Sequence, residues 1–248
     1  MQTGFRGIDT AGQPKHYEEA LVGAAVQWLA QHGVPRELLF LQTKFTPLAG
    51  QDPARLPYDM EAPIEQQVAQ SFAGSLNNLQ TDYLDCYILH SPLMPHTLLM
   101  RAWRAMEEIH ASGAARLLGI SNCYDADILK ALHADALIKP AVVQNRFYRE
   151  TGYDRSLRQW CLSQGVIYQS FWTLTANPHL LDSSTVRSLA RHHGKTEAQV
   201  LFRYLNQSGI LPLTGTTSQQ HMQEDLAIFA FELTAAELES ISRLLDTE

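Results

Sequence analysis

Hydrophobic residues follow two alternating patterns along this chain. Short and nearly continuous apolar runs, such as residues 38–41, indicate strands that are covered on both faces. Longer segments repeat an apolar residue every three or four positions, as at Val68, Phe72, Leu76 and Leu79, which indicates a helix with one buried stripe. Because the two patterns alternate along the whole sequence, they predict a parallel sheet with helical connections.

These patterns divide most of the chain into strands and helices. The apolar runs predict strands at residues 4–10, 38–45, 83–90, 115–122, 140–147, 166–173 and 210–216. The periodic segments predict helices at residues 16–31, 62–79, 97–112, 124–134, 153–164, 196–207 and 235–246. A segment rich in turn-forming residues, 46–61, follows the second strand, and we expect it to form a wall of the substrate site rather than a linker.

Polar residues stand at the C-terminal end of nearly every predicted strand. They are Asp9, Lys44, His90, Ser121, Asn122, Gln144, Asn145, Ser170, Thr214 and Thr216. A (β/α)8 barrel collects its functional residues at these ends, whereas a doubly wound sheet concentrates them at one switch point. We therefore predict an α/β protein with a TIM-type (β/α)8 barrel, in a single domain over residues 1–248.

The predicted barrel is one strand short. Seven strands leave the first strand and helix of a barrel without a counterpart in the sequence, and they leave two sheet edges with unpaired backbone groups. Three explanations stay open: a natural short form, a misplaced start codon, or a barrel completed by another chain. A homo-oligomer stays open as well.

Composition narrows the class of protein. A length of 248 residues, 45% of them apolar, suits one large α/β domain. The net charge of -7 argues against a nucleic-acid partner, and no apolar stretch reaches the ~20 residues that span a bilayer. The N-terminus has no signal-peptide core, so we expect a cytoplasmic protein. Cys86, Cys123 and Cys161 are widely scattered, which suits reduced thiols rather than a metal site.

Five segments, in order along the chain, resemble the aldo-keto reductase family. They are Gly-Phe-Arg-Gly-Ile-Asp-Thr-Ala at 4–11, Leu-Gln-Thr-Lys at 41–44, Tyr-Leu-Asp-Cys-Tyr-Ile-Leu-His-Ser-Pro at 83–92, Leu-Gly-Ile-Ser-Asn at 118–122 and Val-Gln-Asn at 143–145. Each motif alone is weak, but together they cover essentially the whole chain. The resemblance implies a (β/α)8 barrel that binds NADPH or NADH without a Rossmann fold. Consistently, the chain has neither a Gly-x-Gly-x-x-Gly motif nor the Tyr-x-x-x-Lys pair of short-chain dehydrogenases.

The resemblance also implies a catalytic tetrad of Asp, Tyr, Lys and His. Asp9, Lys44 and His90 stand within the matching motifs. We place the tyrosine at Tyr17, because Pro14 occupies the usual position and the Tyr-x-Glu pattern is preserved at Tyr17, within a Gln-Pro-Lys-His-Tyr variant of the motif. Each residue alone has a plainer role, such as a helix cap for the Asp or packing for the Tyr. Their joint occurrence in family order predicts an acid–base site.

Carbonyl reduction explains why these residue types belong together. The reaction needs a hydride at carbon and a proton at oxygen, and a phenol with a pKa near 10 is a poor proton carrier at neutral pH. We expect the ammonium of Lys44 to lower the pKa of Tyr17, and Asp9 to hold Lys44 charged and in place. His90 would orient the carbonyl or assist the proton transfer.

The resemblance assigns a further group of residues to cofactor binding. They are Ser121, Asn122, Gln144, Gln169, Ser170, Phe171, Thr214, Gly215, Thr216, His221 and Asp225. Ser121, Asn122 and Gln144 match the positions that hold the nicotinamide carboxamide, although Ser and Asn commonly make turn hydrogen bonds as well. Gln169 replaces the tyrosine that stacks on the nicotinamide, unless a neighbouring aromatic residue takes over that role.

The segment after the last strand bears on which cofactor is used. Backbone N–H groups of residues 214–216 could hold a phosphate at a helix start. However, Leu213 occupies the position of the family's lysine, and His221 lies near the position of its arginine. The resemblance favours NADP(H) over NAD(H), but the missing cations weaken this preference because arginine is the usual reader of a 2′-phosphate.

We therefore expect an NAD(P)H-dependent reductase of a small-molecule aldehyde or ketone. Two alternatives stay open. One is a non-redox acid–base enzyme, an isomerase or dehydratase on the same scaffold, which would turn over without nicotinamide. The other is a non-catalytic regulatory subunit, which would form a stable hetero-complex.

Overall fold

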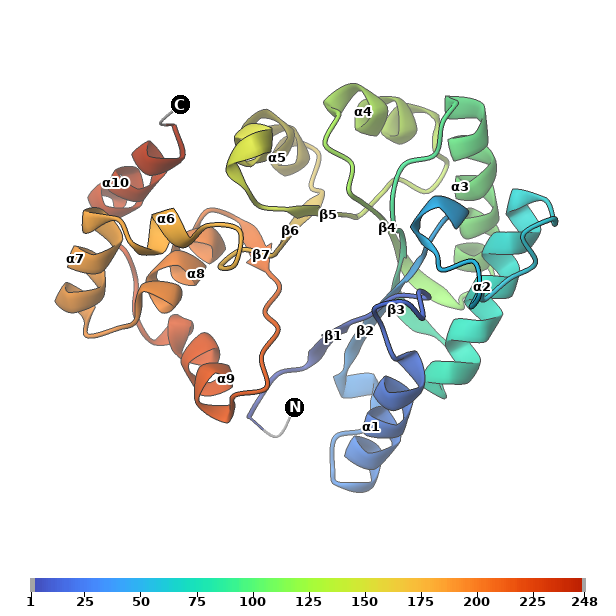
Figure 1. The fold of residues 1–248 in the computed structure, drawn as a ribbon, viewed down its shortest axis with the longest axis horizontal. Helices are drawn as coiled ribbons and strands as arrows, with labels where there is room; N and C mark the ends of the chain where they lie inside the picture. Colours follow the sequence, from blue (N-terminus) through green and yellow to red (C-terminus); the bar gives the residue numbers. More distant parts are fainter. Residues whose placement is uncertain (1–2, 247–248) are drawn as a thin grey trace. The chain divides into compact units, whose positions relative to one another are not determined.

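The computed structural model describes residues 3–246, and the chain divides into two compact units. The first unit spans Arg6–Val143, and the second holds the chain from Gln144 onward together with the segment before Arg6. The division falls within strand β5 (Val142–Arg146). In Figure 1 the first unit runs from blue to green and the second from green to red.

The first unit consists of four strands and four helices in strict alternation. The strands are β1 (Gly7–Asp9), β2 (Phe40–Phe45), β3 (Leu84–Leu89) and β4 (Ala115–Ser121). The helices are α1 (Glu19–Gln31), α2 (Ile64–Leu79), α3 (His96–Ala111) and α4 (Ala126–Asp135). The strands are parallel and pair in chain order, with Asp9 opposite Gln42 and Lys44 opposite Ile88. Every residue of β3 is buried, as its continuous apolar run predicts.

Close packing fixes helix α1 against β2 and α2. The carboxylate of Glu19, at the first position of α1, accepts hydrogen bonds from Thr43 Oγ1 at 2.6 Å and from Asn78 Nδ2 at 3.3 Å. One turn further along, a Cβ at Gly23 would collide with the backbone oxygen of Asn78, so this close approach of the two helices requires glycine. The start of α1, directly after Tyr17, is therefore held rigidly against the strands.

The second unit carries three strands and six helices among its described residues. The strands are β5, β6 (Ile167–Phe171) and β7 (Ile210–Pro212), in chain order, with β6 and β7 parallel. The helices are α5 (Arg155–Ser163), α6 (Pro178–Leu181), α7 (Ser184–His193), α8 (Glu197–Gln207), α9 (Gln219–Leu226) and α10 (Ala235–Leu245). Short 3-10 turns occur in both units, at Arg36–Leu38, Leu48–Gly50, Arg149–Asp154 and Ala227–Ala230.

All seven predicted strands and all seven predicted helices are present, and the α/β class with parallel strands is confirmed. Barrel closure and a single domain stay predictions. Helices α6, α7 and α9 were not predicted, because they carry little apolar surface: α7 buries Val186 and Ala190, and α9 has no buried residue. Capping residues mark α7 instead, with the Ser183 hydroxyl accepting from Val186 N and Gly194 closing the helix at φ 62°. No described helix has the length and apolarity to cross a membrane.

Candidate active site

A buried ion pair at the ends of β1 and β2 forms the base of the candidate site. Lys44 Nζ lies 2.7 and 2.8 Å from the two carboxylate oxygens of Asp9, and 2.9 Å from the backbone oxygen of Thr10. These three acceptors use all three donors of the ammonium. Gln42 Nε2 also donates to Asp9, at 2.6 Å. Because Lys44 is only 1% exposed, these acceptors take the place of water around its ammonium.

Tyr17 lies next to this pair, in the loop before α1. The predicted helix at 16–31 was wrong at its start, because Pro14 begins a turn in which His16 N and Tyr17 N both donate to the Gln13 oxygen. Lys44 Nζ is 5.5 Å from the centroid of the Tyr17 ring, and the rings of Tyr17 and His90 meet edge to face with centroids 6.1 Å apart. The first unit thus brings all four predicted tetrad residues together.

The acidity of Tyr17 differs from the sequence-based expectation. Burial, and to a smaller extent the charge of Asp9, raises the pKa of Tyr17 to about 12. The expected lowering by Lys44 was wrong because Asp9 neutralises that ammonium and takes two of its three hydrogen bonds. At neutral pH the Tyr17 side chain is therefore a protonated phenol, which can act as a proton donor.

His90, directly after β3, is held as a neutral imidazole. Burial, reinforced by the charge of Lys44, lowers the pKa of His90 to about 4. Its Nδ1 lies 2.6 Å from Thr46 Oγ1, and its backbone oxygen accepts from Asn122 Nδ2 at 2.9 Å. When the Thr46 hydroxyl donates to Nδ1, the Nε2 atom carries the proton and becomes the donor.

Sequence reasoning missed Thr46 and the hydrogen bonds that hold its loop. The loop at residues 46–61 is tied to the loop before Tyr17 in both directions: Gln51 Nε2 donates to the Gly12 oxygen at 2.8 Å, and Gln13 Nε2 donates to the Gly50 oxygen at 2.5 Å. The Tyr58 hydroxyl donates to the Thr46 oxygen at 2.8 Å. A signal was available, since Thr46 is two residues after Lys44, where a short polar side chain follows a buried strand.

Two of the cofactor candidates lie at the end of β4 in the first unit. Ser121 is 1% exposed, and Asn122 has a positive φ of 52°, a conformation that asparagine tolerates better than most residues. Besides the bond to the His90 backbone, Asn122 Nδ2 lies 3.3 Å from Ser121 Oγ, and Tyr124 donates to Asn122 Oδ1 at 3.2 Å. These contacts fix the two side chains at the strand end, and they also give Asn122 a structural role.

Three more candidates form a buried polar group on β5 and β6 of the second unit. Gln144 Nε2 donates to Gln169 Oε1 at 2.9 Å, and both residues are at most 3% exposed. The Ser170 hydroxyl pairs with Thr173 Oγ1 at 2.9 Å. Phe171, at the end of β6, is partly exposed. Such amides and hydroxyls fit the recognition of a carboxamide, which both donates and accepts hydrogen bonds.

The last five candidates share one cavity of about 500 Å³ in the second unit. They are Thr214, Gly215, Thr216, His221 and Asp225. The Thr214 hydroxyl donates to Asp225 Oδ2 at 2.6 Å, and burial raises the pKa of Asp225. The size and polar lining of this cavity fit the adenosine end of a dinucleotide. The second unit therefore places these five predicted residues around one cavity, and their role in cofactor binding stays a prediction.

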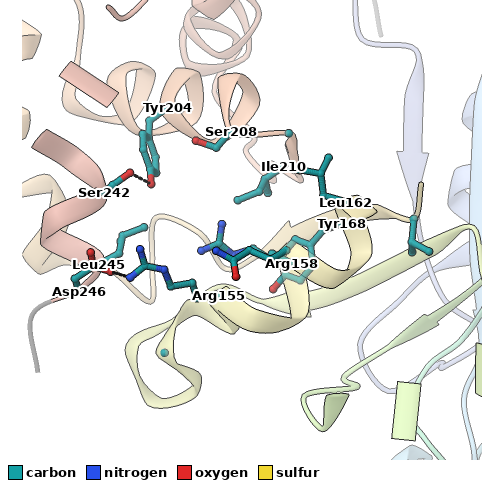
Figure 2. A pocket seen from close by; sticks show the side chains of 14 residues that line it. Arg155, Arg158, Leu162, Tyr168, Tyr204, Ser208, Ile210, Ser242, Leu245 and Asp246 are labelled. Atoms are coloured by element: carbon teal, nitrogen blue, oxygen red, sulfur yellow. Dashed lines mark hydrogen bonds and ion pairs between the residues drawn. The ribbon is translucent and has the colours of Figure 1, made fainter. Parts of the chain in front are cut away.

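A second cavity of about 210 Å³ contains none of the predicted site residues. Figure 2 shows it with Arg155 and Arg158 on one wall and Tyr204 and Ser242 on another. Arg155 forms an ion pair with Asp246, and the hydroxyls of Tyr204 and Ser242 lie 2.9 Å apart. Many polar groups that line this cavity therefore already have partners within the protein.

One further group of side chains could hold a metal ion by its donor set. The ligand atoms of His192, His193 and Glu237 lie within 4.8 Å of one another. However, Glu237 accepts from His193 Nε2 at 2.8 Å and from the backbone of Thr234 at 2.7 Å, where it completes the capping box of α10. Helix capping accounts for this carboxylate.

Comparison of the sequence with known proteins shows the family to which the chain belongs. Residues 1–246 match the model of the Aldo/keto reductase family. The chain is 31% identical over 244 residues to glyoxal reductase of Bacillus subtilis (strain 168), an alignment that covers 98% of this chain and 80% of that protein. It is 29% identical over 246 residues to an aldo-keto reductase of Mycobacterium sp. (strain JLS), covering 99% of this chain and 82% of the other.

Solved structures give the same picture. The crystal structure of a Bombyx mori aldo-keto reductase in complex with NADP has a TM-score of 0.83 and 26% identity, covering 98% of this chain and 79% of that chain. An aldo-keto reductase from a Medee basin deep-sea metagenome library has a TM-score of 0.82 and 25% identity, covering 98% and 82%.

Proposed function

Because the chain belongs to the aldo/keto reductase family, we propose that it reduces an aldehyde or ketone to an alcohol with NADH or NADPH, on a (β/α)8-type scaffold. The observation that carries the proposal is the cluster of Asp9, Tyr17, Lys44 and His90 within one unit, with Lys44 Nζ 5.5 Å from the Tyr17 ring. The bound nicotinamide would supply the hydride to the carbonyl carbon. The protein would supply the proton and hold the carbonyl oxygen.

In this proposal Tyr17 is the general acid. With a pKa of about 12, its hydroxyl keeps its proton at neutral pH and can give it to a substrate oxygen that gains negative charge. Once the proton has left, the phenolate ring lies 5.5 Å from the Lys44 ammonium, whose charge is shared with Asp9. Asp9 fixes the position of Lys44 through two hydrogen bonds.

His90 would orient the substrate rather than exchange a proton with it. A pKa of about 4 keeps the imidazole neutral at physiological pH. With Nδ1 accepting from Thr46, Nε2–H is the donor left for a carbonyl oxygen. Such a donor polarises the carbonyl and sets the position of its oxygen relative to Tyr17.

The cofactor-binding roles follow the residues described in each unit. In the first unit, Ser121 and Asn122 at the end of β4 offer groups that fit a carboxamide. In the second unit, the paired amides of Gln144 and Gln169 on β5 and β6 offer such groups as well. Ser170 and Phe171 would line the nicotinamide, and the cavity at Thr214–Thr216 with His221 and Asp225 would take the adenosine end. The relative named glyoxal reductase supports small aldehydes with a neighbouring carbonyl as first substrates to test.

The test is to follow NADH and NADPH oxidation with glyoxal and phenylglyoxal in wild type, Tyr17→Phe and Tyr83→Phe. Tyr83 is a matched control, because its buried hydroxyl makes no hydrogen bond with another described residue. We expect Tyr17→Phe to lower kcat by about 100-fold or more, with cofactor affinity and fold unchanged, and Tyr83→Phe to keep wild-type activity. A Tyr17→Phe enzyme with near-normal kcat would contradict the role of Tyr17. Turnover without any nicotinamide would contradict the reductase itself.

A further inference from the structure

Carboxylates outnumber cationic residues in the lining of the cavity proposed for the adenosine end. Asp182, Glu197, Glu224 and Asp225 all line it, against two residues that can carry positive charge, Arg187 and His221. Of the two, Arg187 is already bound to Asp182, with 2.7 Å between Nη2 and Oδ1. The cavity thus has an excess of negative charge and little free cationic character.

Asp225 is placed to accept a hydrogen bond from a ligand. Its Oδ2 holds the hydroxyl of Thr214 at 2.6 Å, while its Oδ1 has no hydrogen-bond partner among the described residues. Burial, with a smaller contribution from Glu224, raises the pKa of Asp225, against the opposing effects of Thr214 and His221. A ribose diol offers the hydroxyl donors that such a carboxylate needs. Dinucleotide enzymes of another fold use an acidic residue for the ribose 2′-hydroxyl of NAD in the same chemical sense.

A 2′-phosphate needs cationic partners, whereas this cavity has an excess of carboxylates. It carries close to two negative charges at neutral pH and needs arginine or lysine beside it. Leu213 offers no charge, and Arg187 is paired with Asp182. The start of α9 is partly satisfied as well, because the Ser218 hydroxyl accepts from His221 N at 3.3 Å. With Arg187 and Asp182 paired, His221 is left with three carboxylates in the lining, Glu197, Glu224 and Asp225.

We infer that this cavity makes the chain selective for NAD(H) over NADP(H), with Asp225 accepting a ribose hydroxyl and the surrounding carboxylates disfavouring a 2′-phosphate. The inference rests on the proposed function, since it assigns the adenosine end of the cofactor to this cavity. It reverses the preference for NADP(H) that the family resemblance favours. Selectivity here is set by the charges that line this cavity and not by the tetrad.

Direct binding tests the inference without relying on turnover. The full chain is titrated with NADH and with NADPH by nicotinamide fluorescence, and with AMP and adenosine 2′,5′-bisphosphate by calorimetry. We expect NADH to bind at least about tenfold more tightly than NADPH, and AMP more tightly than the bisphosphate. Raising the salt concentration should narrow the difference, because salt screens a repulsion between exposed charges. If cations held the phosphate, salt would weaken NADPH more than NADH.

Two variants separate charge from shape. Asp225→Asn keeps the size of the side chain and its hydrogen bond but removes the charge, and should improve NADPH affinity relative to NADH. Leu213→Lys with His221→Arg should shift the ratio further in the same direction. Asp246→Asn is the control, because it removes the same charge from the cavity of Figure 2 and should leave the ratio unchanged.

The outcomes distinguish this inference from the proposed function. Equal or tighter binding of NADPH by the wild-type protein would overturn the inference and leave the reductase proposal standing. Tighter binding of NADH than of NADPH, together with an active Tyr17→Phe enzyme, would support the inference and contradict the proposed role of Tyr17. If neither nucleotide binds to the folded protein, both proposals are wrong.

Discussion

The tetrad and the adenosine cavity treat their charges in opposite ways. In the tetrad, the ammonium of Lys44 is 1% exposed and all three of its donors are used by Asp9 and Thr10. In the cavity, four carboxylates stand against Arg187 and His221 and surround an open volume of about 500 Å³. The Lys44 charge is fully paired within the protein. By contrast, the charged residues of the cavity line an open volume, where a bound ligand can contact them.

The largest effect is expected when the ammonium of Lys44 is removed from the tetrad. Lys44→Met removes the ammonium that pairs with the Asp9 carboxylate and lies near Tyr17, while the hydrogen bond from Gln42 to Asp9 is retained. We expect a drop in kcat of about 100-fold or more and a loss of stability on the order of 3 kcal/mol, measured by urea denaturation. Removing both charges, in Asp9→Asn with Lys44→Met, should restore part of the stability but none of the activity. Unchanged stability of the single variant would show that the pair is not the structural base of the site.

A smaller effect is expected from pH, because His90 is held neutral. Its pKa falls from 6.5 to about 4 on folding, so the unfolded chain binds one more proton between these values. Stability from this residue is therefore fully present above pH 6.5 and is lost as the pH falls toward 4, by roughly 2–3 kcal/mol. The free energy of unfolding of wild type and His90→Gln, compared from pH 4 to 7.5, isolates this contribution. Parallel curves for the two proteins would contradict it.

The smallest effect concerns the hydroxyl behind His90. Thr46→Val removes the group 2.6 Å from Nδ1 while keeping the shape of the side chain, and should lower kcat about tenfold by loosening the tautomer and orientation of the ring. The nitrogen shifts of His90 in NMR spectra should change with it, and Thr46→Ser should restore both. An unchanged tautomer with reduced kcat would assign Thr46 to another role.

Features of the fold and site that depend on nearby residues could be predicted from the sequence, whereas features that depend on distant contacts could not. The strands follow from apolar runs such as the one in β3 and could be predicted in advance. Asp9, Lys44 and His90 were found at strand ends, whereas Tyr17, in the loop before α1, was placed only by the family resemblance. Helix α9 could not be predicted, because it buries no side chain and leaves no apolar stripe. The pKa of Tyr17 was predicted in the wrong direction, since it depends on burial and on which acceptors take the hydrogen bonds of Lys44. Burial and hydrogen-bond partners depend on the folded structure and cannot be deduced from the sequence alone.

The paired glutamines Gln13 and Gln51 have a consequence for engineering. Each donates across to the backbone of the other's loop, so the loop that carries Tyr17 and the loop at residues 46–61 are joined at two points. Exchanging one loop for that of a relative, as is done to graft a new substrate range, would break both bonds and displace the proton donor. The two segments should be transplanted as a single cassette, and natural insertions in one should be accompanied by compensating changes in the other.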